Sequence, residues 1–156
     1  MLKIKSTAKF IFILIFLLTS HQLKLNSQEE KNFLTLKSEI VNVRQGHSFD
    51  YPIKFIYRKK NLPVKIIDVW ENFKKIQDYN NNQGWIHVSK LSKRKAAINI
   101  KNNSIIFKKP TIFSKPLARL EKGRLVLVKK CKNLWCKISD ENYTGWVKKE
   151  FLWGKF

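Results

Sequence analysis

The sequence predicts an all-β protein made of two small barrels in tandem, after an N-terminal signal helix. Three observations predict this fold class. Lysines and a short apolar segment stand at the N-terminus, two later segments repeat one order of apolar and turn residues, and no helical periodicity is sustained after residue 27. Short strands in units this small are typical of strongly bent barrels, whose closure protects the strand edges.

Residues 1–27 have the features of a secretory signal peptide. Three lysines precede the apolar stretch 10–18, which is shorter than a typical membrane-spanning helix. Ser20 and Ser27 offer cleavage positions, and the alternative is an uncleaved N-terminal anchor. In both cases we expect the rest of the chain to be exported, as a periplasmic or secreted protein.

The internal repeat defines two predicted barrels, 33–95 and 96–156. Apolar residues recur 62 positions apart, and a Gly-Trp pair recurs 61 positions apart, so that one deletion reconciles the two spacings. The matched pairs are Val64 with Val126, Ile66 with Val128, Phe73 with Trp135, Ile76 with Ile138, Gly84 with Gly145, and Trp85 with Trp146.

Each copy contains the same succession of expected strands and turns. In the first copy, strands over 64–69 and 73–76 precede a polar turn over 78–83 and a strand that begins Gly-Trp. The second copy has strands over 125–128 and 135–138, a turn over 139–144 and another Gly-Trp strand. A basic linker near 91–101 separates the copies.

The exported part of the chain is strongly basic. Removing residues 1–27, which carry four lysines and no acid, lowers the net charge from +21 to +17. Only five of the cations are arginines, the residue that nucleic-acid-binding proteins use for bidentate contacts. The scattered lysines give a general positive potential, so the charge does not predict a nucleic-acid partner. The alternative explanation is the compositional bias of a genome rich in A and T, which favours lysine, asparagine, isoleucine and phenylalanine together. Membrane contact is expected only through the signal or anchor segment, or through weak electrostatics.

Cys131 and Cys136 bracket a turn between two expected strands of the second copy. In an oxidising compartment such a pair usually forms a disulfide, and a turn brings its flanking positions to a suitable separation. A zinc or redox pair is the rival interpretation, but further cysteine ligands are missing from the sequence. We therefore expect a local disulfide, and neither a metal nor a cofactor.

The ends of each copy resemble a known family. The first copy opens with Val41-Asn42-Val43-Arg44-Gln45-Gly46 and closes with Gly84-Trp85-Ile86, and the second closes with Gly145-Trp146-Val147 after a degenerate start. These motifs are similar to those of bacterial SH3-like domains. The tandem pair, with Tyr51-Pro52-Ile53-Lys54 and Trp135-Cys136, resembles a group of small exported proteins of proteobacteria. The resemblance implies two SH3-like barrels and leaves the ligand open. His47 replaces the proline usual in this pattern, which predicts a less rigid first loop.

The same resemblance implies a groove flanked by the first long loop and the neighbouring hairpin. Tyr51, Tyr57 and Trp70 are the candidate aromatic residues for ligand contact, the alternative being that they pack between the barrels. Trp85 and His87 of the closing motif complete the candidate set, although Trp85 also suits packing at the core or rim. Arg44 and Gly46 are expected to shape the loop, the glycine by adopting a backbone conformation that other residues resist.

These observations favour a binding protein over an enzyme. The chain leaves no length for a catalytic domain beside the two copies, and its few histidines, cysteines and acids form no recognisable catalytic set. We expect an exported, non-catalytic module of the cell envelope that binds peptidoglycan or an envelope peptide. The alternative is a structural or assembly factor that docks a single envelope protein partner.

Overall fold

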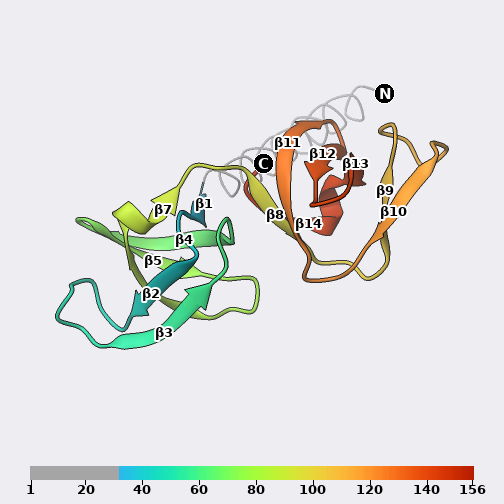
Figure 1. Ribbon diagram of the computed structural model, residues 1–156. Helices are drawn as coiled ribbons and strands as arrows, with labels where there is room; N and C mark the ends of the chain where they lie inside the picture. Colours follow the sequence, from blue (N-terminus) through green and yellow to red (C-terminus); the bar gives the residue numbers. More distant parts are fainter. Residues whose placement is uncertain (1–31) are drawn as a thin grey trace, which may run out of the picture. The chain divides into compact units, whose positions relative to one another are not determined.

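The computed structural model describes residues 32–156, which form one compact unit. This part of the chain contains strands and two short 3-10 turns and no α-helix, which confirms the all-β prediction (Figure 1). The predicted signal helix, residues 1–27, lies outside the described residues. None of the described residues belongs to a helix long and apolar enough to cross a membrane.

The first barrel is a sheet of seven antiparallel strands in the order β3-β2-β6-β5-β4-β1-β7. A 3-10 turn, η1 (Val88–Lys90), precedes the last strand. The short strand β1 pairs with both β4 and β7, which brings the two ends of this repeat together. The strands are β1 (Phe33–Leu36), β2 (Ile40–Arg44), β3 (Ile53–Arg58), β4 (Pro63–Trp70), β5 (Phe73–Gln77), β6 (Gln83–His87) and β7 (Leu91–Ser92).

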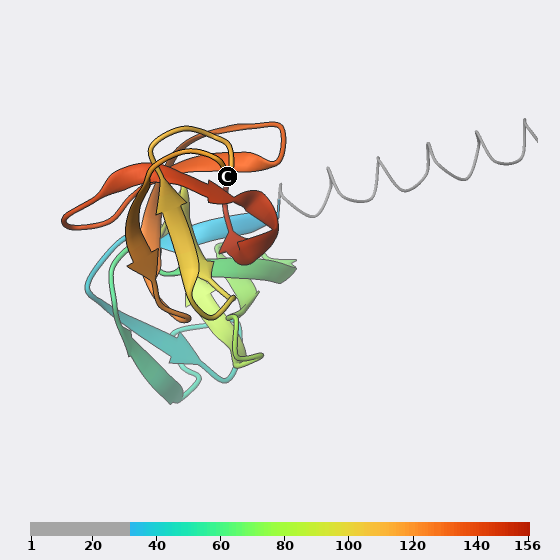
Figure 2. The ribbon, with the colours of Figure 1, turned by 90° about the vertical axis from the view of Figure 1, so that its right-hand side faces the viewer.

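The second barrel repeats this topology strand for strand, in the order β10-β9-β13-β12-β11-β8-β14. Figure 2 faces this barrel and shows its strands, yellow to red, crossing one another steeply. The tandem repeat inferred from residue spacing is thereby confirmed. The elements are β8 (Ala96–Asn99), β9 (Ser104–Phe107), β10 (Pro116–Leu120), β11 (Leu125–Lys132), β12 (Trp135–Ser139), β13 (Thr144–Lys148), the 3-10 turn η2 (Lys149–Phe151) and β14 (Leu152–Gly154).

Four of the aliphatic residues that revealed the repeat lie fully inside the barrels. Val64, Val126, Ile76 and Ile138 are each 1% exposed or less, because alternate residues of a strand face the interior. Each barrel has a cluster of buried side chains from its consecutive strands, and Ile98 of β8 joins the cluster of the first barrel. The period-two pattern of the sequence therefore marks two small cores.

The Gly-Trp pairs have a steric explanation. A Cβ on Gly145 would lie 2.5 Å from Ile106 Cγ2 and 2.7 Å from the carbonyl oxygen of Phe107. In the first barrel, a Cβ on Gly84 would overlap the Cγ1 methyl group of Val43. The residue after each glycine pairs with β2 or β9, so the glycine allows the strands to approach where the barrel closes.

The C-terminal strand closes the second barrel and also touches the first. Strand β14 pairs with β8. The Trp153 ring meets the Phe33 ring edge-on with centroids 4.8 Å apart, and Lys155 Nζ donates to the Phe33 carbonyl oxygen at 3.0 Å. Burial of this amine, together with repulsion from Lys93 and Lys95, lowers the pKa of Lys155.

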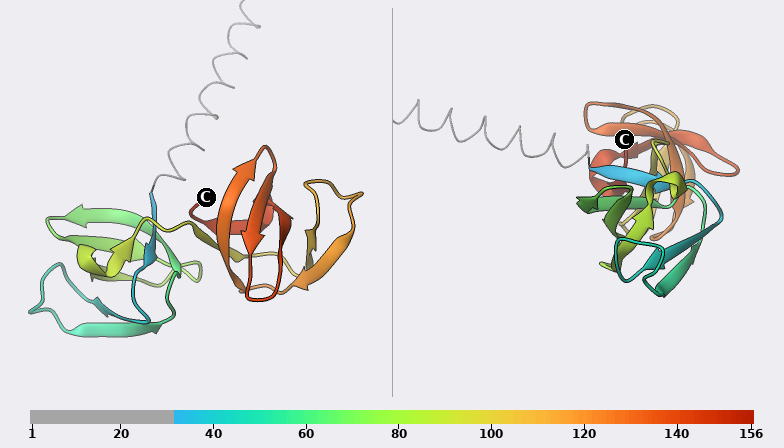
Figure 3. Two further views of the ribbon diagram at one scale, coloured as in Figure 1. Left: turned by 45° about the horizontal axis from the view of Figure 1, so that its top comes forward. Right: turned by 90° about the vertical axis from the view of Figure 1, so that its left-hand side faces the viewer.

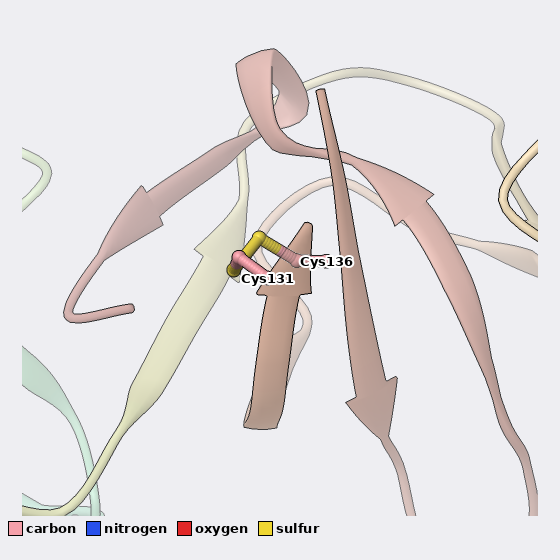
Figure 4. The surroundings of a disulfide bond; sticks show 2 residues. All are labelled: Cys131 and Cys136. Atoms are coloured by element: carbon pink, nitrogen blue, oxygen red, sulfur yellow. A yellow bond between two sulfur atoms is a disulfide. The ribbon is translucent and has the colours of Figure 1, made fainter. Parts of the chain in front are cut away.

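The predicted disulfide between Cys131 and Cys136 is present (Figure 4). The two residues are partners in the β11–β12 register, and their Cα atoms are 4.0 Å apart. Cys136 is fully buried in the second core, so the bridge joins the hairpin where it enters the interior.

Reduction of this disulfide is expected to lower the free energy of unfolding by about 2 kcal/mol, because a six-residue loop is no longer closed in the unfolded chain. Urea unfolding followed by circular dichroism, with and without reductant, measures the difference. A variant with Cys131→Ala and Cys136→Ala serves as the control and must not respond to reductant; equal stability of the oxidised and reduced wild-type protein contradicts the prediction.

Gly84→Ala is expected to destabilise the protein by about 1–3 kcal/mol, because the added methyl group overlaps Val43. Val43→Ala alone leaves a cavity in the core, but it also removes the methyl group that Gly84→Ala meets. The double variant is therefore expected to lose less stability than the sum of the two single variants, and strict additivity in the urea midpoints argues against a steric role for Gly84.

Candidate functional site

A groove of about 300 Å³ lies on the first barrel and is the centre of the candidate site. Its wall is built from β2, the β2–β3 loop, β5, β6 and η1, which the barrel closure brings together. Cations and aromatic rings dominate the lining, and it contains no acidic side chain. The lining residues are Ile40, Asn42, Arg44, Phe49, Phe73, Trp85, His87, Ser89 and Lys90.

Three rings pack against one another in this groove. The centroids of Phe49, Phe73 and His87 are 5.1 Å apart in each of the three pairs. Phe73 and His87 are cross-strand partners of β5 and β6, whereas Phe49 comes from the β2–β3 loop and remains 62% exposed. The guanidinium carbon of Arg44 lies 5.4 Å from the Phe49 ring centroid, so the groove offers a cation beside an aromatic surface.

The imidazole of His87 has a defined role at the start of η1. The backbone N–H of Ser89 donates to His87 Nδ1 at 3.3 Å, and the Ser89 hydroxyl lies 2.8 Å from the same nitrogen. Since Nδ1 accepts, the proton of the neutral ring is placed on Nε2. The ring thus enters the groove in a fixed tautomer with Nε2 as its donor.

A second aromatic group adjoins the groove and holds the β2–β3 loop. The His47 ring centroid lies 4.8 Å from that of Trp70, 5.5 Å from that of Trp85 and 5.7 Å from that of Tyr51. Arg44 Nη1 donates to the Tyr51 carbonyl oxygen at 2.7 Å. Where the family pattern has proline, ring packing around His47 therefore supports this loop.

Gly46 does not have the role that the sequence predicted for it. Its φ angle is not in the left-handed region, so the glycine is not required for an unusual backbone conformation. Instead a Cβ at this position would lie 2.5 Å from the Tyr51 ring. Gly46 is required because the aromatic ring covers its backbone.

The structure brings four of the five sequence-predicted site residues together. Trp85 and His87 line the groove, while Tyr51 and Trp70 are 43% and 53% exposed in the adjoining group around His47. Ligand contact by these residues stays a prediction.

Tyr57, the fifth candidate, has a different environment. Its ring packs against the first core and against Phe55, and its hydroxyl donates to Asp78 Oδ2 at 3.0 Å. Burial, followed by the charge and the hydrogen bond of Asp78, raises the pKa of Tyr57. Asp78 is 5% exposed and also accepts from the backbone of Asn80 and Asn82, so this tyrosine supports a turn.

Sequence reasoning missed Phe49 and Phe73 as site residues and assigned Arg44 only to the loop. The signal for Phe73 was the alternation of β5 and β6, because a residue opposite His87 in an antiparallel pair shares its face. Arg44 had no such signal, because its pairing with Trp85 joins β2 and β6, which are far apart in the chain. Phe49 had no local signal, since the shape of the loop decides where its ring lies.

The second barrel has different side chains at the equivalent positions. Phe107 pairs with Trp146 as Arg44 pairs with Trp85, and Lys148 follows Trp146 by two residues as His87 follows Trp85. Phe107 packs edge-on against Trp135 at 5.7 Å. The two copies therefore share a fold but not a groove lining.

The described residues contain no group of three or more histidine, cysteine or acidic side chains arranged to hold a metal ion. Arginine, lysine and aromatic rings suit the non-covalent binding of a ligand that carries both an anionic group and an apolar or sugar face.

Comparison with known proteins supports the assignment of the repeat. The sequence matches the family described as bacterial SH3 domain twice, over residues 37–93 and 101–154. No curated protein matches the chain. Among solved structures, the chain is similar to NlpC2 and NlpC1 from Trichomonas vaginalis, each at 13% identity with a TM-score of 0.37. The matches cover 80% of this chain but 48% and 46% of those chains, so it spans about half their length.

Tyr57→Phe is expected to reduce the free energy of unfolding by about 1–3 kcal/mol, because the buried Asp78 carboxylate loses a hydrogen-bond donor. Urea unfolding measures the effect. Tyr51→Phe is the matched control, since the Tyr51 hydroxyl makes no hydrogen bond with the described residues. Equal stability of Tyr57→Phe and the wild-type protein rules out the supporting role assigned to this hydroxyl.

Proposed function

Because the chain belongs to the bacterial SH3 domain family, we propose that it is an exported, non-catalytic binding module of the cell envelope. Its ligand is peptidoglycan or an envelope peptide, bound in the groove of the first barrel. The observation that carries the proposal is the convergence of Arg44, Phe49 and His87 on one groove. Family membership supports the ligand class, since bacterial SH3 domains commonly bind cell-wall peptidoglycan.

The chemistry of the groove matches that of peptidoglycan. Stem peptides carry carboxylates, for which Arg44 and Lys90 supply positive charge at the groove. The faces of sugars and the methyl groups of short peptides pack on aromatic rings, and Phe49 is largely exposed for such a contact. Because the groove contains no acidic side chain, an anionic ligand meets no like charge there.

Export is part of the proposal, and the disulfide supports it. Disulfides persist in the periplasm and outside the cell, whereas cytoplasmic reductants keep most thiols reduced. The bridge between Cys131 and Cys136 is therefore consistent with the signal peptide inferred from residues 1–27.

A second candidate function is docking of one envelope protein partner, as a structural or assembly factor. Strand β3 forms one edge of the first sheet and carries Ile53 and Ile56, each 44% exposed. An exposed edge strand can pair with an extended segment of another protein. Capture of a partner that is lost with Ile56→Lys, while binding to peptidoglycan is unchanged, distinguishes this function from the first.

The groove is tested by sedimentation of the chain beginning at residue 28 with purified peptidoglycan sacculi. Phe49→Ala is expected to weaken retention about tenfold, because it removes the exposed ring from the groove. Retention is also expected to fall as the salt concentration rises, since the contribution of Arg44 and Lys90 is screened.

Tyr143→Ala is the matched control for this test. Tyr143 is an exposed aromatic residue, 47% accessible, in the second barrel and outside the groove. Its replacement is expected to leave retention unchanged. If the wild-type chain is not retained at low salt, peptidoglycan is not the ligand; if both variants weaken retention equally, the groove is not the binding site.

A further inference from the structure

The loop between β9 and β10 of the second barrel presents two neighbouring apolar side chains to solvent. Ile112 is 57% exposed and Phe113 is 92% exposed, the largest value among the exposed large hydrophobic residues of the described chain. Figure 3 shows this loop at one end of the β9–β10 hairpin, coloured yellow to orange. Exposure of a whole phenylalanine ring to water is unfavourable, so its placement requires an explanation.

Hydrogen bonds within the loop fix this arrangement. At the base of the loop, the Lys108 N–H donates to the Lys115 carbonyl oxygen at 3.0 Å, and the Lys109 N–H donates to Ser114 Oγ at 2.9 Å. Across the tip, the Ser114 N–H donates to the Thr111 carbonyl oxygen at 3.2 Å. The loop is therefore a closed turn that holds its apolar residues outward.

Lysines stand on both sides of this apolar tip in the sequence. Lys108, Lys109 and Lys115 are all exposed and flank the two apolar residues, and residues 101–120 contain no acidic side chain. The loop therefore combines two exposed apolar side chains with three exposed lysines close to them in sequence. Neither a neutral apolar pocket nor the basic surface of a second copy of this chain complements that combination.

The equivalent loop of the first barrel has a different arrangement. There the aromatic residue, Phe49, packs against Phe73 and His87 of its own barrel. The Phe113 ring makes no ring contact with any described residue, although both loops connect equivalent strands. The outward ring is thus a property of the second copy and is not imposed by the fold.

We propose that this loop anchors the second barrel to the surface of an anionic lipid bilayer. Ile112 and Phe113 enter the boundary between headgroups and acyl chains, while the three flanking lysines lie at the level of the lipid phosphates. Apolar side chains next to lysines are the combination that binds peripherally to such interfaces. The site goes beyond the proposed function, because it uses the other barrel and no groove residue.

Vesicle sedimentation with the chain beginning at residue 28 tests the proposal, since residues 32–156 form a compact unit with both cores. The probes are vesicles of phosphatidylcholine alone and of phosphatidylcholine with phosphatidylglycerol. We expect binding to the anionic vesicles only. Phe113→Ser is expected to weaken it at least about tenfold through lost apolar burial. Lys108→Ser with Lys109→Ser is expected to weaken it by about fivefold per lysine.

Three controls make the result specific. Phe113→Trp keeps a large ring and is expected to retain binding, with additional fluorescence quenching by lipids brominated in their acyl chains. Lys59→Ser with Lys60→Ser removes the same charge from a loop of the first barrel and is expected to leave most binding intact. Unchanged thermal unfolding of Phe113→Ser shows that the exposed ring does not support the fold.

Several outcomes overturn the proposal. These are equal binding of Phe113→Ser and the wild-type chain, equal binding to neutral and anionic vesicles, and self-association that depends on Phe113 without vesicle binding. The groove is tested independently, because Phe49→Ala is expected to leave vesicle binding unchanged and Phe113→Ser to leave retention on sacculi unchanged.

Discussion

The close approach of two strands at a glycine is the constraint on which each barrel depends. At Gly84 and Gly145 the backbone of one strand lies where a side chain would collide with the strand opposite. This approach lets each seven-stranded sheet bend until two strands meet, β2 with β6 in the first barrel and β9 with β13 in the second. A small aliphatic core lies inside each bend. A side chain at this point would separate the strands and open the core to water.

The same closure builds the candidate site. Because β2 and β6 meet at Arg44 and Trp85, the loop that follows β2 lies against the residues of β5 and β6. Phe49 then reaches Phe73 and His87, while His47 reaches Trp70 and Trp85. Residues distant in sequence thus form one surface. Ring packing also holds the β2–β3 loop, which carries His47 and Phe49, in place.

Duplication has preserved the cores and changed the loops. Val64 and Val126 are equivalent and buried, as are Ile76 and Ile138, because the interior of a small barrel tolerates little change in volume. The loops meet no such restriction. The first copy turns its aromatic loop residue toward its own groove, and the second turns Phe113 to solvent, so that one fold offers two different surfaces.

The sequence by itself determined the all-β class, the duplication and the positions of the main strands, since residue spacing directly records which side chains face a barrel interior. It also indicated the disulfide, because a short turn limits how far apart Cys131 and Cys136 can lie. Only the tertiary structure decided that Tyr57 supports a turn, that Phe49 lines a groove and that Phe113 faces outward. Those outcomes depend on loop conformation and on contacts between strands far apart in the chain, which local periodicity does not encode.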